Sequence, residues 1–437
     1  MKFTKMSLVA ALLIGSSAFA LENTKVSGDA NIYYTTSDSG AGYDAVAGND
    51  GDLFSKDSSG ADVAINLNAT TDVLKNDLVT VSAGASYSIL TTLGLENNFV
   101  SNTFGGAHKA TAGTGANYAK AVGGAKVENA SWFKEAWVAA TAGKTTAKLG
   151  RMALDTPLAF SEKWSAEENT FEGLVLINQN IPDTTLVGAY VGNGNGTETF
   201  GQNEQSNVET LGLAAGPVVN ANGKFTTYGT NGAYAAGVIN NSWKPLTAQA
   251  WYYNVVQLAT AYWLQADLDA SSLGVNGLTL GAQYSSLTLD GSGMNEDTVY
   301  ALKLGYEMKD MFAASVAFSQ TNDDGSLGSV GFNTATSTGA SKLYTESWWT
   351  YGKVTQTDTS AYNITVTSPV NGLFDLGLYY TSADQSDAKG DNDLNEFTMT
   401  AGKDFGPLNL TLAYINTDLG HNTDTINTVQ AYATVKF

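Results

Sequence analysis

The sequence predicts an all-β fold, a transmembrane antiparallel β-barrel of about 18 strands with short periplasmic turns and long extracellular loops. Three observations indicate this fold: an export signal at the N-terminus, repeated segments of alternating apolar and polar residues, and an aromatic last residue, Phe437. A period of two residues is typical of strands that face lipid on one side and a lumen on the other.

Residues 1–20 have the pattern of a cleavable secretory signal peptide. Lys2 and Lys5 precede an apolar run from Met6 to Ile14, and small residues lead up to Ala20. We expect residues 21–437 to form a single barrel domain, because no later run reaches the roughly 18 apolar residues of a membrane-spanning helix. The chain has no cysteine, which excludes disulfides and thiolate metal sites.

Segment 300–307 illustrates the strand pattern. Tyr, Leu, Leu and Tyr share one face, while Ala, Lys, Gly and Glu share the other, and segments 312–319, 374–380, 408–414 and 63–69 repeat the alternation. The aromatic residues at both ends of the apolar face indicate the two membrane interfaces. By this parity, three charged side chains face the lumen, namely Lys303, Glu307 and Asp375.

Two kinds of connection alternate along the chain. Short turns such as Asn276-Gly277 favour tight hairpins. Long polar loops are expected at 36–60, 91–130, 152–169, 192–233, 290–297, 320–360, 382–394 and 416–424, with one short outer turn at 255–258. Counting from a strand at 26–34 to one at 425–437 gives about eighteen strands, an even number that leaves both termini in the periplasm. Sixteen is the alternative if the weak segment 234–239 is a loop.

Several short patches resemble the OprD-like porins, and among them the Campylobacter-type major outer membrane porins. The patches are Glu135-Ala136-Trp137-Val138, Lys148-Leu149-Gly150-Arg151, Leu154-Asp155-Thr156-Pro157, residues 169–173 and the tract 251–267. The resemblance implies an 18-stranded barrel whose third and seventh loops, here near 152–169 and 320–360, fold inward to form a constriction. It also implies a homotrimer in the Campylobacter-type branch, in the outer membrane of a Gram-negative cell.

The resemblance further implies a ladder of basic residues for carboxylate-bearing solutes, and here the sequence departs from it. Arg151 is the only arginine in the chain, so a passive diffusion channel for ions and small hydrophilic solutes fits better. Removing Lys2 and Lys5 changes the net charge from −20 to −22, and the eight long loops together carry −18. An acidic mouth favours cations and argues against nucleic acid as a partner. The alternative is that these loops stay solvated beside lipopolysaccharide and outer membrane lipid.

The loop at 152–169 holds the candidates for the pore constriction. Four carboxylates accompany one base within it, and two more bases lie at its entry: Asp155, Glu162, Lys163, Glu167 and Glu168, with Lys148 and Arg151 before them. Strand parity points Lys148 toward the lumen and places Arg151 with Leu149 on the lipid side. The alternative is a solvated loop lying over the barrel rim.

Other chemistry is weakly indicated. Four acidic residues could hold a hard cation such as Ca²⁺, although they do not match an EF-hand: Asp384, Asp387, Asp391 and Asp393. The two histidines, His108 and His421, lie in predicted outer loops without a recognisable nucleophile nearby, so we expect neither an enzyme nor a resident cofactor. Phe437 is expected to serve as the assembly signal. The alternative to a porin is a secreted or surface β-rich adhesin or structural protein.

Overall fold

The structure is a computed structural model that describes residues 22–38, 52–55, 58–95, 99–100, 129–163, 166–196, 223–229, 231–331, 333, 340–390, 392–420 and 425–437. The first strands are β1 (Glu22–Ser37), β2 (Ser59–Lys75), β3 (Thr80–Thr91), β4 (Ala130–Ala142), β5 (Thr145–Met152), β6 (Phe171–Asn178), β7 (Thr184–Gly194), β8 (Thr226–Thr227), β9 (Ala233–Asn240) and β10 (Leu246–Val255). They are followed by β11 (Ala259–Asp269), β12 (Leu278–Leu289), β13 (Asp297–Met308), β14 (Phe312–Thr321), β15 (Thr359–Val370), β16 (Phe374–Gln385), β17 (Leu394–Phe405), β18 (Leu408–Asp418) and β19 (Ile426–Lys436).

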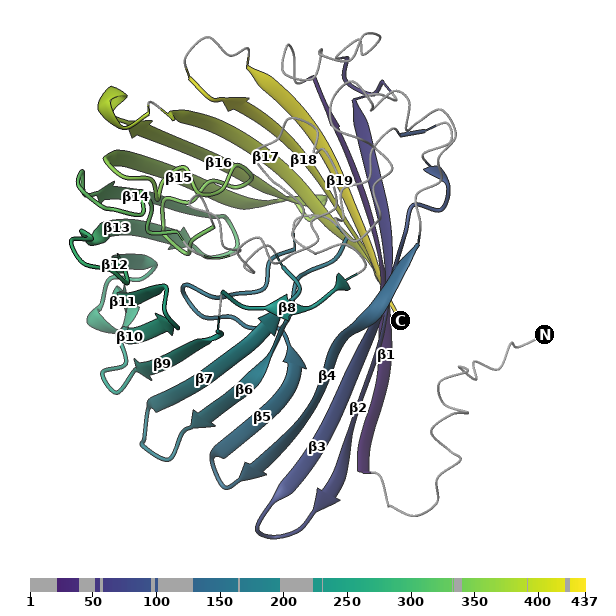
Figure 1. Cartoon of the computed structure of the whole chain (residues 1–437). Helices are drawn as coiled ribbons and strands as arrows, with labels where there is room; N and C mark the ends of the chain where they lie inside the picture. The colour runs from purple at the N-terminus through teal and green to yellow at the C-terminus, as the bar shows by residue number, and fades with distance from the viewer. Residues whose placement is uncertain are drawn as a thin grey trace.

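Consecutive strands pair antiparallel around a closed barrel (Figure 1). The short strand β8 pairs only with the end of β7, while β7 and β9 pair directly with each other. Without β8, the wall that the described residues form has 18 strands, which confirms the prediction and rules out 16. The weak segment 234–239 is part of β9, a full member of the wall.

Closure joins β1 to both β2 and β19. At this seam Gly28 N–H donates to Phe437 O at 2.8 Å, and Phe437 N–H donates to Gly28 O at 2.9 Å. A Cβ atom at position 28 would overlap the Phe437 ring. Glycine therefore lets the terminal ring approach the β1 backbone closely, which is a use that strands make of this residue.

The strands reach further than the alternation predicts. β1 extends to Ser37 and β16 to Gln385, so the predicted loops at 36–60 and 382–394 begin inside strands. Backbone pairing continues above the lipid-facing band, where the side chains need not alternate. The described part of the chain also contains two short 3-10 turns, η5 (Ala270–Leu273) and η6 (Asp387–Lys389). Within the described ranges, no helix is long and apolar enough to cross a membrane.

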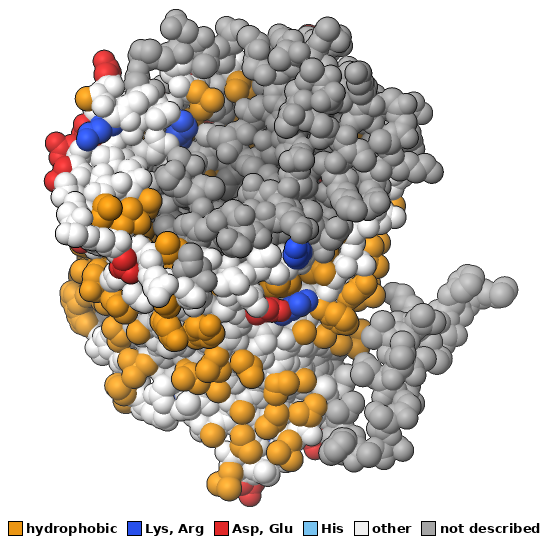
Figure 2. Space-filling model, viewed as in Figure 1, with side chains coloured by type: hydrophobic (Ala, Val, Ile, Leu, Met, Phe, Trp, Pro, Cys, Tyr) orange, Lys and Arg blue, Asp and Glu red, His pale blue; other side chains and the backbone are white. Residues whose placement is uncertain are grey.

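The outer face of the barrel carries the apolar members of each alternating strand. Tyr300, Leu302 and Leu304 on β13 are exposed by 48%, 56% and 47%, although large apolar side chains are usually buried in water-soluble proteins. In Figure 2 hydrophobic side chains spread over the strands of the barrel wall. An apolar exterior around a closed barrel is what a lipid environment requires.

Part of the barrel interior is filled. The inner faces of β10 and β11 carry Trp251, Tyr253 and Trp263, all at least 94% buried. Two residues from long connections, Leu158 and Leu343, belong to the same apolar cluster. This side of the lumen is therefore packed like a protein core, and a second, smaller buried cluster that includes Tyr33, Trp132 and Ile415 lies on the side of β1, β4 and β18.

Candidate pore constriction

The connection between β5 and β6, residues 153–170 and here called L3, reaches across the barrel. Near its tip, Leu158 N–H donates to Tyr253 Oη on β10 at 3.4 Å, and Phe160 N–H donates to Asn333 Oδ1 at 2.8 Å. Asp155 pairs with Lys342. Asn333 and Lys342 belong to residues 322–358, the connection between β14 and β15, here called L7.

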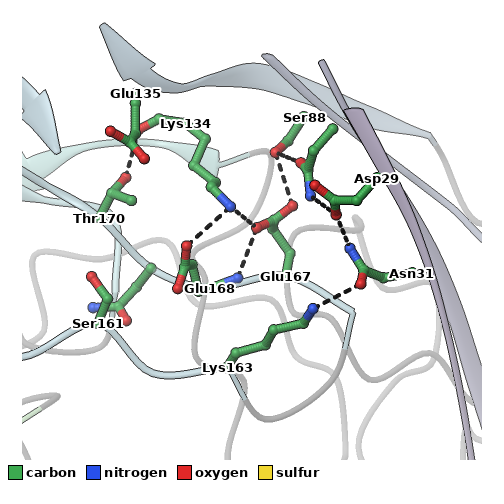
Figure 3. Close-up of polar contacts among 12 residues, drawn as sticks. Asp29, Asn31, Ser88, Lys134, Glu135, Ser161, Lys163, Glu167, Glu168 and Thr170 are labelled. Atoms are coloured by element: carbon green, nitrogen blue, oxygen red, sulfur yellow. Dashed lines mark hydrogen bonds and ion pairs between the residues drawn. The ribbon is translucent and has the colours of Figure 1, made fainter. Parts of the chain in front are cut away.

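The other end of L3 is bound to the wall of β1, β3 and β4 (Figure 3). Lys134 Nζ on β4 lies 2.8 Å from Glu167 Oε1 and 3.1 Å from Glu168 Oε1. Ser88 Oγ on β3 donates to the second oxygen of Glu167 at 2.8 Å. Because the Glu167 side chain is only 1% exposed, these partners offset the large cost of removing its charge from water.

A β-bulge brings Lys134 into the lumen. Ser86 pairs with Glu135 but the next residue, Tyr87, pairs with Phe133, so Lys134 is the extra residue of β4. Phe133 is 50% exposed on the outer face, whereas Trp132 is buried inside. A bulge shifts the in-and-out alternation by one residue and redirects side chains, and here it turns a lysine toward the carboxylates of L3.

Lys163 extends from L3 back to the wall, where its Nζ donates to Asn31 Oδ1 at 2.9 Å. Burial lowers the pKa of Lys163, and the neighbouring carboxylate of Glu167 opposes that shift. Asp29 accepts hydrogen bonds from Asn31 and Asn66 beside it. The base of L3 thus carries a network of alternating acidic, basic and amide groups.

L7 is held against the wall by carboxylates that accept backbone N–H groups. Glu396 on β17 accepts from Trp349 at 2.8 Å and from Thr350 at 2.7 Å. On the packed side of the lumen, Tyr344 Oη donates to Asp267 on β11 at 2.5 Å. Because these wall residues belong to strands on different sides of the barrel, L7 lies across the lumen rather than over the rim.

Glu346 organises L7 internally. Its carboxylate accepts hydrogen bonds from Ser341 Oγ at 2.7 Å and from the N–H groups of Ser341, Ser347 and Gly352 at 3.0 to 3.3 Å. Burial nevertheless raises the pKa of Glu346 to about 7 from its usual 4.5, against the lowering effect of these donors.

Two cavities meet in the open part of the lumen. The first has an empty volume of about 990 Å³, part of it open to solvent, between L3, L7 and strands β18 and β19. It is lined by Phe160, Ser161, Glu162, Lys163, Trp348, Trp349, Tyr351, Thr411 and Tyr432. The second has an empty volume of about 980 Å³, likewise partly open to solvent, near the short turns, and its charged lining residues are Glu307, Asp310 and Asp375. Thr411 lines both cavities. These two neighbouring cavities, here called the open path, lie beside the packed side of the interior.

The structure places the predicted constriction residues in three different environments. Glu162 and Lys163 line the first cavity, whereas Glu167 and Glu168 bind the wall behind it. Asp155 lies toward the tip, where its side chain is 86% exposed beside Lys342. L3 has Lys163 as its single base, and Lys134 and Lys342 from other elements pair with three of its four acids.

The two bases at the entry to L3 differ from each other. Lys148 lies 3.8 Å from Glu135, with its Nζ over the Trp137 ring. β5 continues to Met152 through Gly150 at φ +129°, and Arg151 Nε donates to Glu172 at 2.7 Å. Its guanidinium carbon lies 4.1 Å from the centre of the Phe225 ring.

The predicted lumen-facing charges are also spread along the path. Glu307 and Asp375 line the second cavity, near the short turns. Lys303 is covered by L7, with its Nζ 4.8 Å from the centre of the Tyr344 ring. It therefore belongs to the packed side of the lumen rather than to the open path.

The acidic stretch proposed for calcium is divided between different elements. Asp384 is part of β16, Asp387 begins η6, and Asp393 accepts the N–H of Gln385 at 2.9 Å. Asp391, His108 and His421 lie outside the described residues. Among the described residues, no three acidic or histidine side chains are grouped to hold a metal ion. Calcium binding stays a prediction.

Sequence reasoning missed the wall partner of L3 and the aromatic lining. A signal for Lys134 exists in the run Trp132-Phe133-Lys134-Glu135-Ala136-Trp137, where strict alternation fails at two adjacent charges. The aromatic residues of L7, Trp348, Trp349 and Tyr351, carry no period, because they lie in an irregular segment. Only the folded loop brings them to Tyr432 on β19.

The closed wall, the apolar exterior and the partly open interior define the class of this protein. It is a closed transmembrane β-barrel of 18 antiparallel strands. No protein-family model matches the chain, and no curated protein sequence matches it.

Solved structures of Pseudomonas aeruginosa proteins share this fold across nearly the whole chain. OccK9 (OpdG) is similar with a TM-score of 0.70 at 12% identity, covering 95% of this chain and 99% of that one. The outer membrane protein OpdK, in its structure with vanillate, is similar with a TM-score of 0.66 at 14% identity, covering 96% of this chain and 99% of that one. At this identity the similarity establishes the fold. The fold expected from the OprD-like resemblance is confirmed, and closeness to the Campylobacter-type branch stays a prediction.

Proposed function

We propose that this protein is an outer membrane porin through which ions and small hydrophilic solutes diffuse passively. The observation that carries the proposal is the pair of cavities sharing Thr411, which lie inside a closed barrel with an apolar exterior. Barrels of this size leave a lumen that water can occupy. The likeness in fold to the Pseudomonas outer membrane proteins supports the same conclusion.

In this proposal L3 and L7 narrow the channel. Their contacts with strands on both sides of the lumen support a constriction formed by Glu162 and Lys163 on one side and L7 on the other. Glu167, Glu168 and Lys134 hold L3 in place without facing the solute.

We also propose that the channel prefers cations. The charged residues that line the second cavity are three carboxylates, and the long outer loops carry most of the acidic excess of the sequence. Carboxylates at a pore mouth raise the local concentration of cations and repel anions, an effect that salt weakens.

Conductance of the purified protein in a planar lipid bilayer tests both proposals. We expect discrete channel steps in KCl and, under a KCl gradient, a reversal potential of the sign that cations produce. Absence of steps would contradict the porin function, whereas steps with anion preference would contradict only the charge argument. A homotrimer, contacts with lipopolysaccharide and a role for Phe437 in assembly stay proposals, and cross-linking of the intact membrane protein tests the first.

A further inference from the structure

The cavity between L3 and L7 has an unusual lining. Five of its nine lining residues are aromatic, namely Phe160, Trp348, Trp349, Tyr351 and Tyr432, whereas aromatic residues make up 11% of the chain. A diffusion channel that only passes ions has no need of such a surface. Trp349 is 3% exposed and packs in a buried cluster, whereas Phe160, Trp348, Tyr351 and Tyr432 are partly exposed and offer ring surface to a solute.

The aromatic surface continues from the first cavity toward the second. The ring of Trp348 lies 6.4 Å from that of Trp349 and 6.3 Å from that of Tyr379 on β16. Tyr379 lines the second cavity, so Trp348 links the aromatic lining of one cavity to the other. Rings at these separations form a continuous face along the path.

Contacts with strands of the barrel wall hold this aromatic surface in position before any solute binds. Glu396 holds the N–H groups of Trp349 and Thr350, the two residues that follow Trp348. On the other side of the cavity Tyr432 packs on Tyr33 with ring centres 4.9 Å apart. A ligand surface that is already fixed loses little entropy when a solute binds.

The polar lining residues indicate which solutes fit. Glu162 and Lys163 carry opposite charges, and Ser161 and Thr411 add hydroxyl groups that donate and accept. These two charges cancel, so the lining as a whole is neutral. A cation entering the cavity is repelled by Lys163 and an anion by Glu162. A neutral sugar ring satisfies both parts of the lining, because its C–H face packs on aromatic rings while its hydroxyl edge forms hydrogen bonds.

We propose that the aromatic lining around Trp348 is a subsite for neutral pyranose sugars inside the channel. This inference rests on the proposed porin function and names a class of solute for it. Sugars would bind weakly and pass, as a few polar groups and apolar faces in a concave site allow.

The test is the block of KCl current by maltotriose through single channels of the full-length protein. We expect a saturable decrease of current with maltotriose, and a smaller, unsaturated one with a polyethylene glycol of similar mass. In Trp348→Ala the half-blocking concentration should rise about five-fold, the equivalent of one lost aromatic contact. Trp348→Phe keeps an aromatic ring and should recover part of the affinity. It serves as the second variant in case Trp348→Ala alters the conformation of L7.

Tyr380→Ala is the matched control, because Tyr380 adjoins Tyr379 in sequence but is 39% exposed and faces outward. It should leave the block unchanged. Channels that conduct KCl normally but show no saturable block by maltotriose would overturn the subsite while leaving the porin function intact. Stronger block by benzoate or tetramethylammonium than by maltotriose would also overturn it, in favour of an aromatic anion or an organic cation.

Discussion

Lys134 on β4 and Glu167 in L3 are 33 residues apart in the chain, and their charged atoms lie 2.8 Å apart inside the barrel. The contact depends on the bulge that turns Lys134 inward, and it ties the return segment of L3 to the wall. The side chains are 12% and 1% exposed, so solvent screens the pair weakly.

Replacing Lys134 should release L3. Lys134→Met leaves Glu167 and Glu168 without their cation, and removing one partner of a buried pair costs about 3 kcal/mol or more. We expect larger and noisier single-channel conductance in KCl, with the barrel still intact by its heat-dependent gel mobility. Lys144→Met, an exposed change in the turn after β4, is the control, and an unaltered conductance in Lys134→Met would show that L3 is held by other contacts.

Neutralising the carboxylates of the second cavity should weaken the cation preference. The triple variant Glu307→Gln, Asp310→Asn, Asp375→Asn removes the carboxylates that line the second cavity. We expect its reversal potential under a KCl gradient to move at least halfway toward zero, because the local field is lost. Asp404→Asn, a change at the same end of the barrel outside the cavity lining, should have little effect. If the triple variant keeps the wild-type reversal potential, selectivity originates elsewhere.

The channel should respond to pH through Glu346. Its pKa is about 7 in the folded loop and 4.5 in its usual range, so the folded loop favours the neutral acid. The resulting stabilisation is present below pH 4.5 and is lost as the pH rises through 7, on the order of 3 kcal/mol in total.

We therefore expect current noise from L7 to increase between pH 5 and pH 8 in single-channel recordings. Glu346→Gln, which keeps a neutral side chain at every pH, should remove that dependence. A variant that retains the full wild-type pH profile would assign the response to other groups.

The barrel seam should tolerate no side chain at Gly28. Gly28→Val would push against the Phe437 ring and the carbonyl of Asn66, and overpacking of this kind costs about 1 to 3 kcal/mol. We expect less folded barrel, measured by gel mobility with and without boiling. Gly188→Ala is the matched control, because a Cβ there meets nothing within 4 Å. Equal yields of folded barrel from the two variants would show that barrel closure does not depend on the contact between Gly28 and Phe437.

The strand rhythm was accessible from the sequence because it is a local property. Segment 300–307 alternates residue by residue, and the structure places those residues on the expected faces of β13. The strand ends were less accessible, as β16 shows, because backbone pairing continues where the apolar signal stops. The residues of L3 could be listed as candidates, but their individual roles could not be separated.

The sequence by itself determined the class of fold and the acidic excess, because residue alternation, turn residues and charge are local features of the chain. The pairing of β9 in the structure decided for 18 strands rather than 16. Only the tertiary structure decided which side of the lumen is packed, that Lys134 faces Glu167, and that Trp348 lies between Trp349 and Tyr379. The physical reason is that bulges and irregular loops carry no period. Their side chains acquire a direction only from partners that are distant in sequence.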